Sequence, residues 1–290
     1  MEKYAERAQV LIEALPYLQN FRGQTVVIKY GGSAMEDPRL IASVVRDVVF
    51  LEAAGINPVI VHGGGKAITK RMKERGLQAQ FIAGQRVTDQ ASVDIVDEVL
   101  SKEITPGIAT QIEAKGGKAR AFSGRDVFKA IKSAPFEYKG EMVDLGFVGE
   151  VVGCQVLRVL EAVREEVVPV ISPVGEDEQG QAYNVNADIA ASEMAISLEA
   201  AKLIYLSDVN GVLRDPQNPE TRIPTITPKD IEQLKKDGII DGGMLPKMNS
   251  CLKALKHGVG KIHLIDGRIP HALLLELFTD RGIGTEIVRA

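Results

Sequence analysis

The sequence predicts an α/β protein with a mostly parallel central sheet and helices on both of its faces. Two continuously apolar runs, residues 25–28 (TVVI) and 58–61 (PVIV), are typical of strands buried on both faces. Each run leads into consecutive glycines, at residues 31–32 and 63–65, which allow a sharp turn at the end of a strand. Helical patterns alternate with such strands along the whole chain, which indicates βαβ units.

The elements of the first half follow this plan in order. After the first glycine turn, residues 39–54 have a helical apolar pattern that Gly55 ends, and Gly76 ends the next helix. Asp89 is a suitable N-cap for a third helix. We expect helices at residues 39–54, 66–75, 91–102 and 107–115, and strands at residues 25–29, 58–62 and 119–122.

The second half alternates in the same way. Residues 129–150 are richer in turns and contain a probable hairpin arm at 147–151, while residues 216–228 are irregular and interrupted by prolines. Asp188 stands at the start of a helix. We expect helices at residues 156–165, 189–199, 228–236 and 248–257, strands at 167–172, 202–206 and 261–265, and a final edge strand in the last residues.

The chain divides into a helix over residues 1–20, a lobe over residues 21–175 and a second lobe over residues 176–290, with the boundary in a polar, glycine-containing stretch. Pro16 should kink or divide the first helix, because proline has no backbone N–H to donate. Its apolar stripe packs either on the body of the protein or on another subunit. The stripe consists of Tyr4, Ala8, Leu11, Leu15 and Leu18.

Length and composition exclude several classes of protein. The 290 residues carry a net charge of −4, which gives no basic face for nucleic acid. The two cysteines, Cys154 and Cys251, lack metal-ligand spacing, so we expect neither disulfides nor a metal site built from protein ligands. With no membrane-spanning run and no signal peptide in the pattern, we expect a cytoplasmic protein.

The motifs favour phosphate chemistry without either common phosphate fingerprint. Neither a P-loop nor a dinucleotide G-x-G-x-x-G motif is present, and no serine lies in a nucleophile elbow. The candidate residues for phosphate chemistry are two lysines near glycines. Lys29 lies at the first glycine turn and Lys247 follows a later Gly-Gly pair, and the Asp188 carboxylate could hold both ammonium groups. An ionised carboxylate acceptor would need no general base. Each lysine could equally be a solvated surface charge, and Asp188 a simple helix cap.

Seven motifs together make the chain resemble the amino acid kinase family. They are KYGGSAM, VIVHGGGKAI, GQRVTD, NVNADIAA, LIYLSDVNGVL, DGGMLPKM and GIGTEIV, nearly collinear from about residue 20 to the C-terminus. The resemblance implies a three-layer αβα sandwich with a mainly parallel sheet, an amino-acid lobe and a nucleotide lobe. It is strongest to the family branch that phosphorylates the γ-carboxylate of N-acetyl-L-glutamate with ATP in arginine biosynthesis.

The resemblance also assigns roles residue by residue. It makes Lys29 and Lys247 stabilise the transferring phosphoryl group while Asp188 organises them. Arg86 would clamp the substrate α-carboxylate, a task that suits its bidentate fork. The remaining matched positions are Asn184, Gly64 and Gly65 at the amino-acid substrate, and Gly32, Gly64, Ser207, Asp208, Gly211, Gly243 and Met244 at the nucleotide. Magnesium would be held mainly by ATP phosphates and water.

Family members that arginine inhibits have an N-terminal helix and a C-terminal stretch like those of this chain. The resemblance implies a hexamer, as a trimer of dimers joined by that helix. It also implies an arginine site containing His263, Glu276, Gly282 and Gly284, with Glu276 paired to the guanidinium. Glu276 could instead be a solvated helix residue.

Two other functions stay open at this point. Other members of the family act on aspartate, glutamate, carbamate or UMP, although these would not be expected to carry Arg86 within GQRVTD. A catalytically silent amino-acid sensor is the second alternative. It is disfavoured because Lys29, Asp188 and Lys247 are all present.

Overall fold

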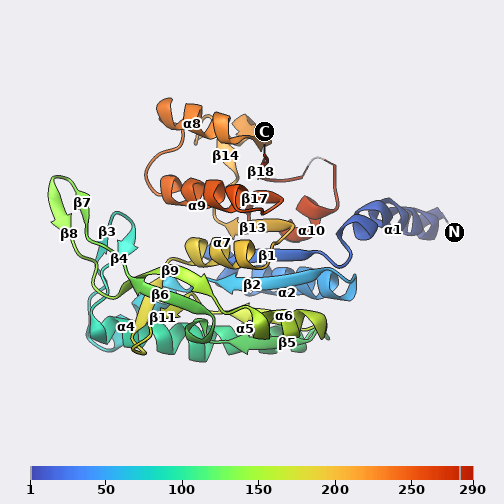
Figure 1. The fold of residues 1–290 in the computed structure, drawn as a ribbon. Coiled ribbons are helices and arrows are strands. Elements are labelled where there is room, and N and C mark those ends of the chain that lie inside the picture. The colour runs from blue at the N-terminus through green and yellow to red at the C-terminus, as the bar shows by residue number, and fades with distance from the viewer. Residues whose placement is uncertain (1, 281, 290) are drawn as a thin grey trace.

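One mainly parallel sheet of eight strands crosses the whole molecule (Figure 1). The computed structural model describes residues 2–280 and 282–289, and within helix α1 (Glu2–Phe21) it describes the side chains of Tyr4 and of residues from Ala8 onward. In spatial order the strands of the sheet are β16 (Thr225–Ile226), β18 (Thr285–Ile287), β17 (Lys261–Asp266), β13 (Lys202–Ser207), β1 (Thr25–Tyr30), β2 (Asn57–His62), β10 (Val168–Ile171) and β5 (Ala119–Phe122).

The glycine-ended strands form the centre of this sheet. β1 lies between β13 and β2 and is parallel to both, with Lys29 opposite Tyr205 on one side and Val61 on the other. The three strands therefore end at the same edge of the sheet. In an open α/β sheet this carboxyl edge is where ligands bind.

Helices cover both faces of the sheet, as the sequence predicts. Along β1, Val27 belongs to a core with helices α6, α7 and α9, whereas Val26 and Ile28 belong to a core with helices α2, α5 and α10. The helices after α1 are α2 (Pro38–Ala53), α3 (Gly65–Glu74), α4 (Gln90–Asp97), α5 (Thr105–Glu113), α6 (Leu157–Arg164), α7 (Ala187–Ser197), α8 (Pro228–Lys236), α9 (Met244–Lys256) and α10 (Ala272–Leu277). This is the predicted αβα sandwich.

A second, smaller β-structure is built from strands that follow β5 or β10 in the chain. It is a closed barrel of β11 (Val174–Glu176), β12 (Ala182–Val185), β9 (Val148–Cys154) and β6 (Phe128–Lys132). β6 and β9 are antiparallel, so the predicted hairpin arm at 147–151 is confirmed. The predicted lobe boundary at residue 175 falls inside β11, and it stays a prediction.

Short hairpins and turns complete the fold. The hairpins pair β3 (Phe81–Ile82) with β4 (Gln85–Arg86), β7 (Phe136–Tyr138) with β8 (Glu141–Val143), and β14 (Val212–Leu213) with β15 (Arg222–Ile223). The 3₁₀ turns are η1 (Gly32–Met35), η3 (Gly124–Asp126) and η4 (Pro219–Thr221), and η2 (Glu98–Ile104) is a π-helical segment. The β7–β8 hairpin projects from the body in Figure 1.

The structure joins segments that the sequence separates. Helix α1 is not divided at Pro16 but runs through it to Phe21, and the kink that was the other possibility there stays a prediction. The helices expected at 91–102 and 107–115 are joined, because η2 connects α4 to α5. Pro106 cannot donate to the carbonyl four residues earlier, and the wider i to i+5 pattern before it keeps the chain helical.

The end of the chain also differs from the prediction. The final strand, β18, is not at an edge, since it lies between β16 and β17 and is antiparallel to β17. The edge is β16, from a segment that the sequence predicts to be irregular. Helix α10 was not predicted, because its six residues are stabilised by burial of Leu273 and Leu277 against α2 rather than by a long periodic pattern.

Within the described part of the chain, none of the helices combines the length and the apolar character that a membrane crossing requires.

Candidate functional site

The first glycine turn fits closely around the side chain of Lys29. A Cβ atom on Gly31 would lie 2.6 Å from Lys29 Nζ, although the φ angle of Gly31, −168°, is ordinary extended backbone. A side chain at Gly31 would displace the ammonium end of Lys29, so glycine at this position leaves room for the lysine to fold back over the turn. Gly32 differs, because it has a φ of +71° and a Cβ there would lie 2.7 Å from Asp208 Oδ1.

Asp208 holds this turn from the end of β13. Its Oδ1 accepts a hydrogen bond from the backbone N–H of Ser33 at 2.8 Å and another from the Ser33 hydroxyl. Burial by itself would raise the pKa of Asp208, but these bonds lower it. Asp208, which the resemblance places at the nucleotide, thus also stabilises the turn at Gly32.

Asp188 joins the two lysines. Its Oδ1 lies 3.1 Å from Lys29 Nζ, and its Oδ2 accepts a hydrogen bond from Lys247 Nζ at 2.5 Å. Burial by itself would raise the pKa of Asp188, but Lys29 and Lys247 lower it to about 2. The alternative of a solvated surface charge is therefore wrong for both lysines, since the side chains of Lys29 and Lys247 are 13% and 11% exposed and that of Asp188 is 20% exposed.

Two helix N-termini position Asp188 and Lys247, while Lys29 lies on β1. Asp188 lies in the first turn of α7, where Asn186 is the N-cap and accepts a hydrogen bond from the Asp188 N–H at 2.8 Å. The cap is therefore Asn186, which leaves the Asp188 carboxylate to the lysines. Lys247 lies in the first turn of α9, with its Nζ 4.6 Å from the ring centroid of the buried Tyr205.

Arg86 lies in a neighbouring cavity of about 270 Å³ that Lys29 and Asp188 also line. Its guanidinium donates to the Gly65 carbonyl at 2.9 Å and to Thr69 Oγ1 at 2.8 Å. The guanidinium also stacks on Phe81, with Cζ 4.7 Å from the ring centroid. Only 6% of Arg86 is exposed, and burial lowers its pKa. Among the described side chains no carboxylate forms an ion pair with it. A buried guanidinium with neutral partners favours an anionic ligand in the cavity.

Asn184 faces the same cavity from β12. Its side-chain amide donates to Thr88 Oγ1 at 3.2 Å, and the Thr88 hydroxyl donates to the Arg86 carbonyl at 2.9 Å. The fully buried Thr88 therefore links two residues that the sequence places almost a hundred positions apart. The structure brings Asn184 and Arg86 together as predicted.

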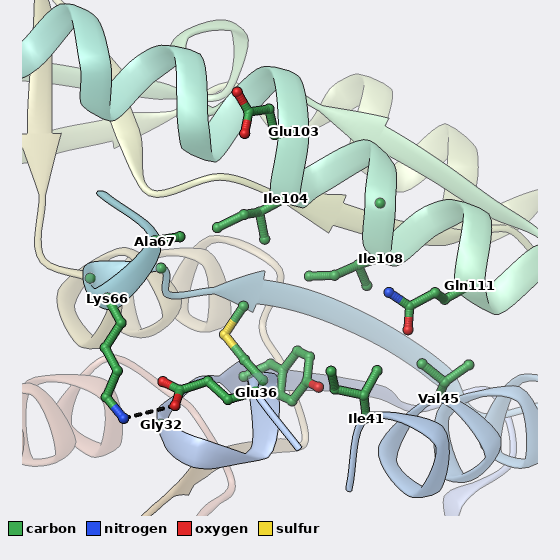
Figure 2. Close-up of a pocket in the computed structure, with 15 residues that line it drawn as sticks. Gly32, Glu36, Ile41, Val45, Lys66, Ala67, Glu103, Ile104, Ile108 and Gln111 are labelled. Carbon is green, nitrogen blue, oxygen red and sulfur yellow. Dashed lines mark hydrogen bonds and ion pairs between the residues drawn. The ribbon is translucent and has the colours of Figure 1, made fainter. Parts of the chain in front are cut away.

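The second glycine turn separates this cavity from a larger one. The larger cavity, of about 540 Å³, lies between α2 and α5 (Figure 2). Gly64 and Gly65 line both cavities, whereas Gly32 lines only the larger one. At the rim, Lys66 Nζ lies 2.8 Å from Glu36 Oε2. Lys66, which follows the three glycines, therefore pairs with Glu36 and not with Asp188.

Apart from Gly32 and Gly64, the residues expected at the nucleotide line neither of these two cavities. Gly211 has a packing reason of its own, because a Cβ there would lie 2.4 Å from Thr285 Oγ1. Gly243 is the N-cap of α9 and Met244 its first residue, so both stand three or four positions before Lys247. Ser207 ends β13, and Asp208 follows it at the carboxyl edge of the sheet.

The residues expected at an arginine site line a separate cavity of about 500 Å³ between the C-terminal region and α1. Glu276 is buried there, so its reading as a solvated helix residue is wrong. One of its oxygens accepts from His263 Nδ1 at 2.6 Å, and the other from the Ile283 and Gly284 N–H groups at 2.6 and 3.0 Å. A Cβ on Gly282 would lie 2.7 Å from Glu276, at a φ of +55°.

Lys202 completes this cluster. Its Nζ lies 3.0 Å from His263 Nε2, and burial lowers the pKa of both groups, that of Lys202 to about 8. Because an ammonium group can only donate, His263 Nε2 accepts and its Nδ1–H donates to Glu276. The imidazole is therefore neutral and held between a cation and an anion.

Sequence reasoning missed several residues that the structure places at these sites. Thr88 and Asn186 lie within the motifs GQRVTD and NVNADIAA, which drew attention to these segments, but the sequence assigned no role to either residue. Phe81 and Lys202 lie outside any motif, and their roles follow only from their contacts with Arg86 and His263.

Comparison with known proteins identifies the family of the chain. The model of the Amino acid kinase family matches residues 24–266. An acetylglutamate kinase from Akkermansia muciniphila is 47% identical over 285 residues, which cover 98% of this chain and 96% of that protein. An acetylglutamate kinase from Methanocaldococcus jannaschii is 46% identical over 298 residues, which cover 100% of this chain and 98% of that protein.

A solved structure agrees with these matches. N-acetylglutamate synthase from Neisseria gonorrhoeae, complexed with coenzyme A and L-arginine, superposes with a TM-score of 0.78 at 25% identity over 97% of this chain. This chain spans 65% of the length of that synthase. The fold, the family match and the relatives agree, and the chain belongs to the amino acid kinase family.

Proposed function

We propose that the protein transfers the γ-phosphoryl group of ATP to the γ-carboxylate of N-acetyl-L-glutamate, giving N-acetyl-L-glutamyl 5-phosphate and ADP in arginine biosynthesis. The observation that carries this proposal is the bridge of Asp188 between Lys29 and Lys247 beside the cavity of Arg86. The acetylglutamate kinases that match nearly the full chain support the choice of substrate.

The cavity of Arg86 is the proposed site of the acyl amino acid. The guanidinium pairs with the substrate α-carboxylate, which supplies the anion that the buried charge lacks. Asn184 and the backbone of Gly64 and Gly65 line the same space and contact the acyl amino acid. The γ-carboxylate then points toward Lys29 and Asp188 at the other end of the cavity.

The lysines act on the charge of the transferring group. A γ-carboxylate oxygen attacks phosphorus while the bond to the β-phosphate oxygen breaks and ADP leaves. Lys29 and Lys247 neutralise the phosphoryl oxygens, and the N–H groups of Gly32 and Gly64 donate hydrogen bonds to them. Asp188 remains ionised and keeps both ammonium groups in place, since its pKa is about 2. The acceptor is already a carboxylate, so no general base takes part.

The C-terminal lobe is the proposed nucleotide site. Ser207, Asp208, Gly211, Gly243 and Met244 border it. Among the described residues no cluster of three or more His, Cys, Asp or Glu side chains is arranged to hold a metal ion. We therefore assign magnesium to ATP phosphates and water, where it would neutralise phosphate charge. We also place the enzyme in the cytoplasm.

A panel of acceptors tests the substrate assignment. ADP release and trapping of the acyl phosphate with hydroxylamine are measured with N-acetyl-L-glutamate, glutamate, aspartate, carbamate and UMP. Both signals with N-acetyl-L-glutamate alone support the proposal. Turnover with another acceptor assigns the chain to a different branch of the family, and binding without turnover assigns it to an amino-acid sensor.

Arginine feedback is the second part of the proposal. The cluster of Lys202, His263 and Glu276 lines a cavity with Tyr17 and Phe21 of α1, which links an effector site to the helix proposed to join subunits into a hexamer. The arginine-bound synthase structure supports this assignment by analogy of fold. Glu276 would exchange its bond to His263 for a guanidinium. A Glu276→Gln variant that keeps its activity but loses arginine inhibition supports the site, and unchanged inhibition removes Glu276 from it.

A further inference from the structure

His62 is buried at the joint between β2 and the second glycine turn. It is the last residue of β2, none of it is exposed, and the proposed mechanism does not use it. Its Nδ1 lies 2.7 Å from the carbonyl oxygen of Gly63, and its Nε2 lies 2.6 Å from Thr105 Oγ1. The imidazole thus connects the glycine turn to the start of α5.

The proton positions in this network follow from the partners. Burial lowers the pKa of His62 to about 4, so the ring is neutral at neutral pH and carries one proton. The Gly63 carbonyl can only accept, which places that proton on Nδ1. Nε2 is then bare and can only accept. The Thr105 hydroxyl has two acceptors within reach, His62 Nε2 at 2.6 Å and the Leu100 carbonyl at 2.7 Å, and its one proton serves one of them at a time.

This bond sets the direction of the next amide. The carbonyl of Gly63 and the N–H of Gly64 belong to one planar trans peptide, so they point in opposite directions. A carbonyl held by His62 therefore directs the Gly64 N–H to the opposite side of that peptide. The preceding peptide is fixed as well, because the Gly63 N–H donates to the Tyr30 carbonyl at 2.7 Å.

Without such a bond the peptide between Gly63 and Gly64 has little to hold it. Glycines on both sides allow it to rotate into its flipped orientation at low steric cost. Leu100 and Ile104 of the π-helical segment lie near the Cα of Gly64, where a Cβ would be 2.5 Å from Leu100 and 2.7 Å from Ile104, and these apolar side chains offer the peptide no hydrogen bond. Figure 2 shows Ile104 in the wall of the larger cavity.

We propose that His62 is a positioning residue, which fixes the Gly63–Gly64 peptide so that the Gly64 N–H donates to the transferring phosphoryl group. The proposal rests on the function proposed above for the glycine turn. A role in packing alone would be met by any side chain of similar volume, whereas this role requires a donor at the position of Nδ1.

The tautomer is tested on the wild-type protein without any activity measurement. Long-range ¹H–¹⁵N NMR of ¹⁵N-histidine-labelled protein at neutral pH distinguishes a protonated from a bare ring nitrogen. We expect Nδ1 to be protonated and Nε2 to be bare. A bare Nδ1 cannot donate to the Gly63 carbonyl and overturns the proposal, whether or not the enzyme phosphorylates N-acetyl-L-glutamate.

A pair of variants then tests the consequence for turnover. The side-chain amide of His62→Asn places an N–H near the position of Nδ1, whereas His62→Leu keeps an apolar side chain of comparable reach without a donor. We expect kcat to fall about 10²-fold in His62→Leu, as for loss of one preorganised donor, and to stay within about tenfold in His62→Asn. The KM for the acceptor should change little in either, and exposed His257→Leu serves as the control.

Each outcome of this comparison decides something. Near wild-type kcat in His62→Leu, or equal losses in both variants, overturns the positioning role. If His62→Leu does not fold, the NMR tautomer and the His62→Asn rate still test it. If the wild-type enzyme is inactive with every acceptor, the proposed function is rejected. The position of the His62 proton is measured without any activity assay, so that result is read independently of this failure.

Discussion

Lys247 and Asp188 meet where two helices begin, with Lys247 Nζ donating to Asp188 Oδ2 at 2.5 Å between the first turns of α9 and α7. Their contact brings residues 59 positions apart to the end of β1, where Lys29 reaches the other carboxylate oxygen at 3.1 Å. One anion thus holds two cations, which leaves a local excess of positive charge for a phosphoryl group.

Removing either lysine should impair transfer. Lys29→Ala and Lys247→Ala are each expected to lower kcat on the order of 10²-fold or more, because each removes a charge aimed at the transferring group. Steady-state kinetics with ADP detection measures the effect. Lys253→Ala is the matched control, since Lys253 lies on the same helix but pairs with Glu193 at the surface. Near wild-type turnover in either lysine variant would remove that lysine from the mechanism.

Asp188 should also make stability depend on pH. Its folded-state pKa, about 2, is below the unfolded value of 3.8, so ionisation stabilises the fold fully above about pH 4. This contribution is lost as the pH falls from about 4 through 2. The difference in unfolding free energy between wild type and Asp188→Asn should therefore be largest near pH 7 and shrink below pH 4. Denaturant unfolding at several pH values measures it, and a constant difference down to pH 2 would contradict it.

Arg86 should affect the acceptor and not the nucleotide. Arg86→Lys is expected to raise the KM for N-acetyl-L-glutamate roughly tenfold or more, because a point charge cannot replace the bidentate clamp or the stacking on Phe81. The KM for ATP should stay within about twofold. Arg75→Lys, at an exposed ion pair with Glu98, controls for loss of a guanidinium elsewhere. If the KM for ATP rose more than the KM for N-acetyl-L-glutamate, the cavity of Arg86 would belong to the nucleotide and the assignment of the two lobes would be reversed.

Gly64 should resist any side chain. A Cβ on Gly64 would lie 2.5 Å from Leu100 and 2.7 Å from Ile104, so Gly64→Ala must displace these side chains or the turn. We expect a loss of about 1–3 kcal/mol in stability, as for overpacking. Gly107→Ala is the control, because nothing lies within 4 Å of its Cβ position and alanine favours a helix. Denaturant unfolding measures both stabilities. Equal values for the two variants would contradict the prediction and show that Leu100 and Ile104 can move aside at little cost.

The sequence predicted the sheet and the charged centre because local patterns encode them. Apolar runs mark β1 and β2, and the glycines after them mark the turns. The trio of Lys29, Asp188 and Lys247 could be predicted because strands and helix starts converge at the carboxyl edge of a parallel sheet.

Features that depend on contacts between distant residues were not predictable in this way. Pairing of β18 between β16 and β17 depends on which strands meet, and the apolar pattern of the chain does not record that. Thr88 and Phe81 are ordinary residues until Arg86 is buried against them. The π-helical segment brings Leu100 and Ile104 close to Gly64, a contact between distant residues that helical periodicity does not record.

The N-terminal helix provides the last prediction, which rests on the proposed hexamer. Tyr4, Leu11 and Leu15 of its stripe are 70%, 69% and 45% exposed, and Figure 1 shows α1 reaching away from the sheet. The end of the helix contacts the body, where Tyr17 donates to Asp280 and packs edge-on against Phe278. An exposed stripe of this kind is suited to an isologous contact with a second copy.

Deleting residues 1–15 should therefore reduce the assembly to dimers while Tyr17 and Phe278 remain in contact. Because the cavity that we propose for arginine is lined by Tyr17 and Phe21 at the end of α1, inhibition by arginine should weaken, whereas basal kcat should stay within about twofold. Light scattering gives the mass and an arginine titration gives the inhibition constant. Leu11→Glu tests the stripe without a deletion, and Gln19→Glu, on an exposed position of the same helix, is its control. A truncated enzyme that stays hexameric and equally sensitive would show that neither assembly nor inhibition uses this helix.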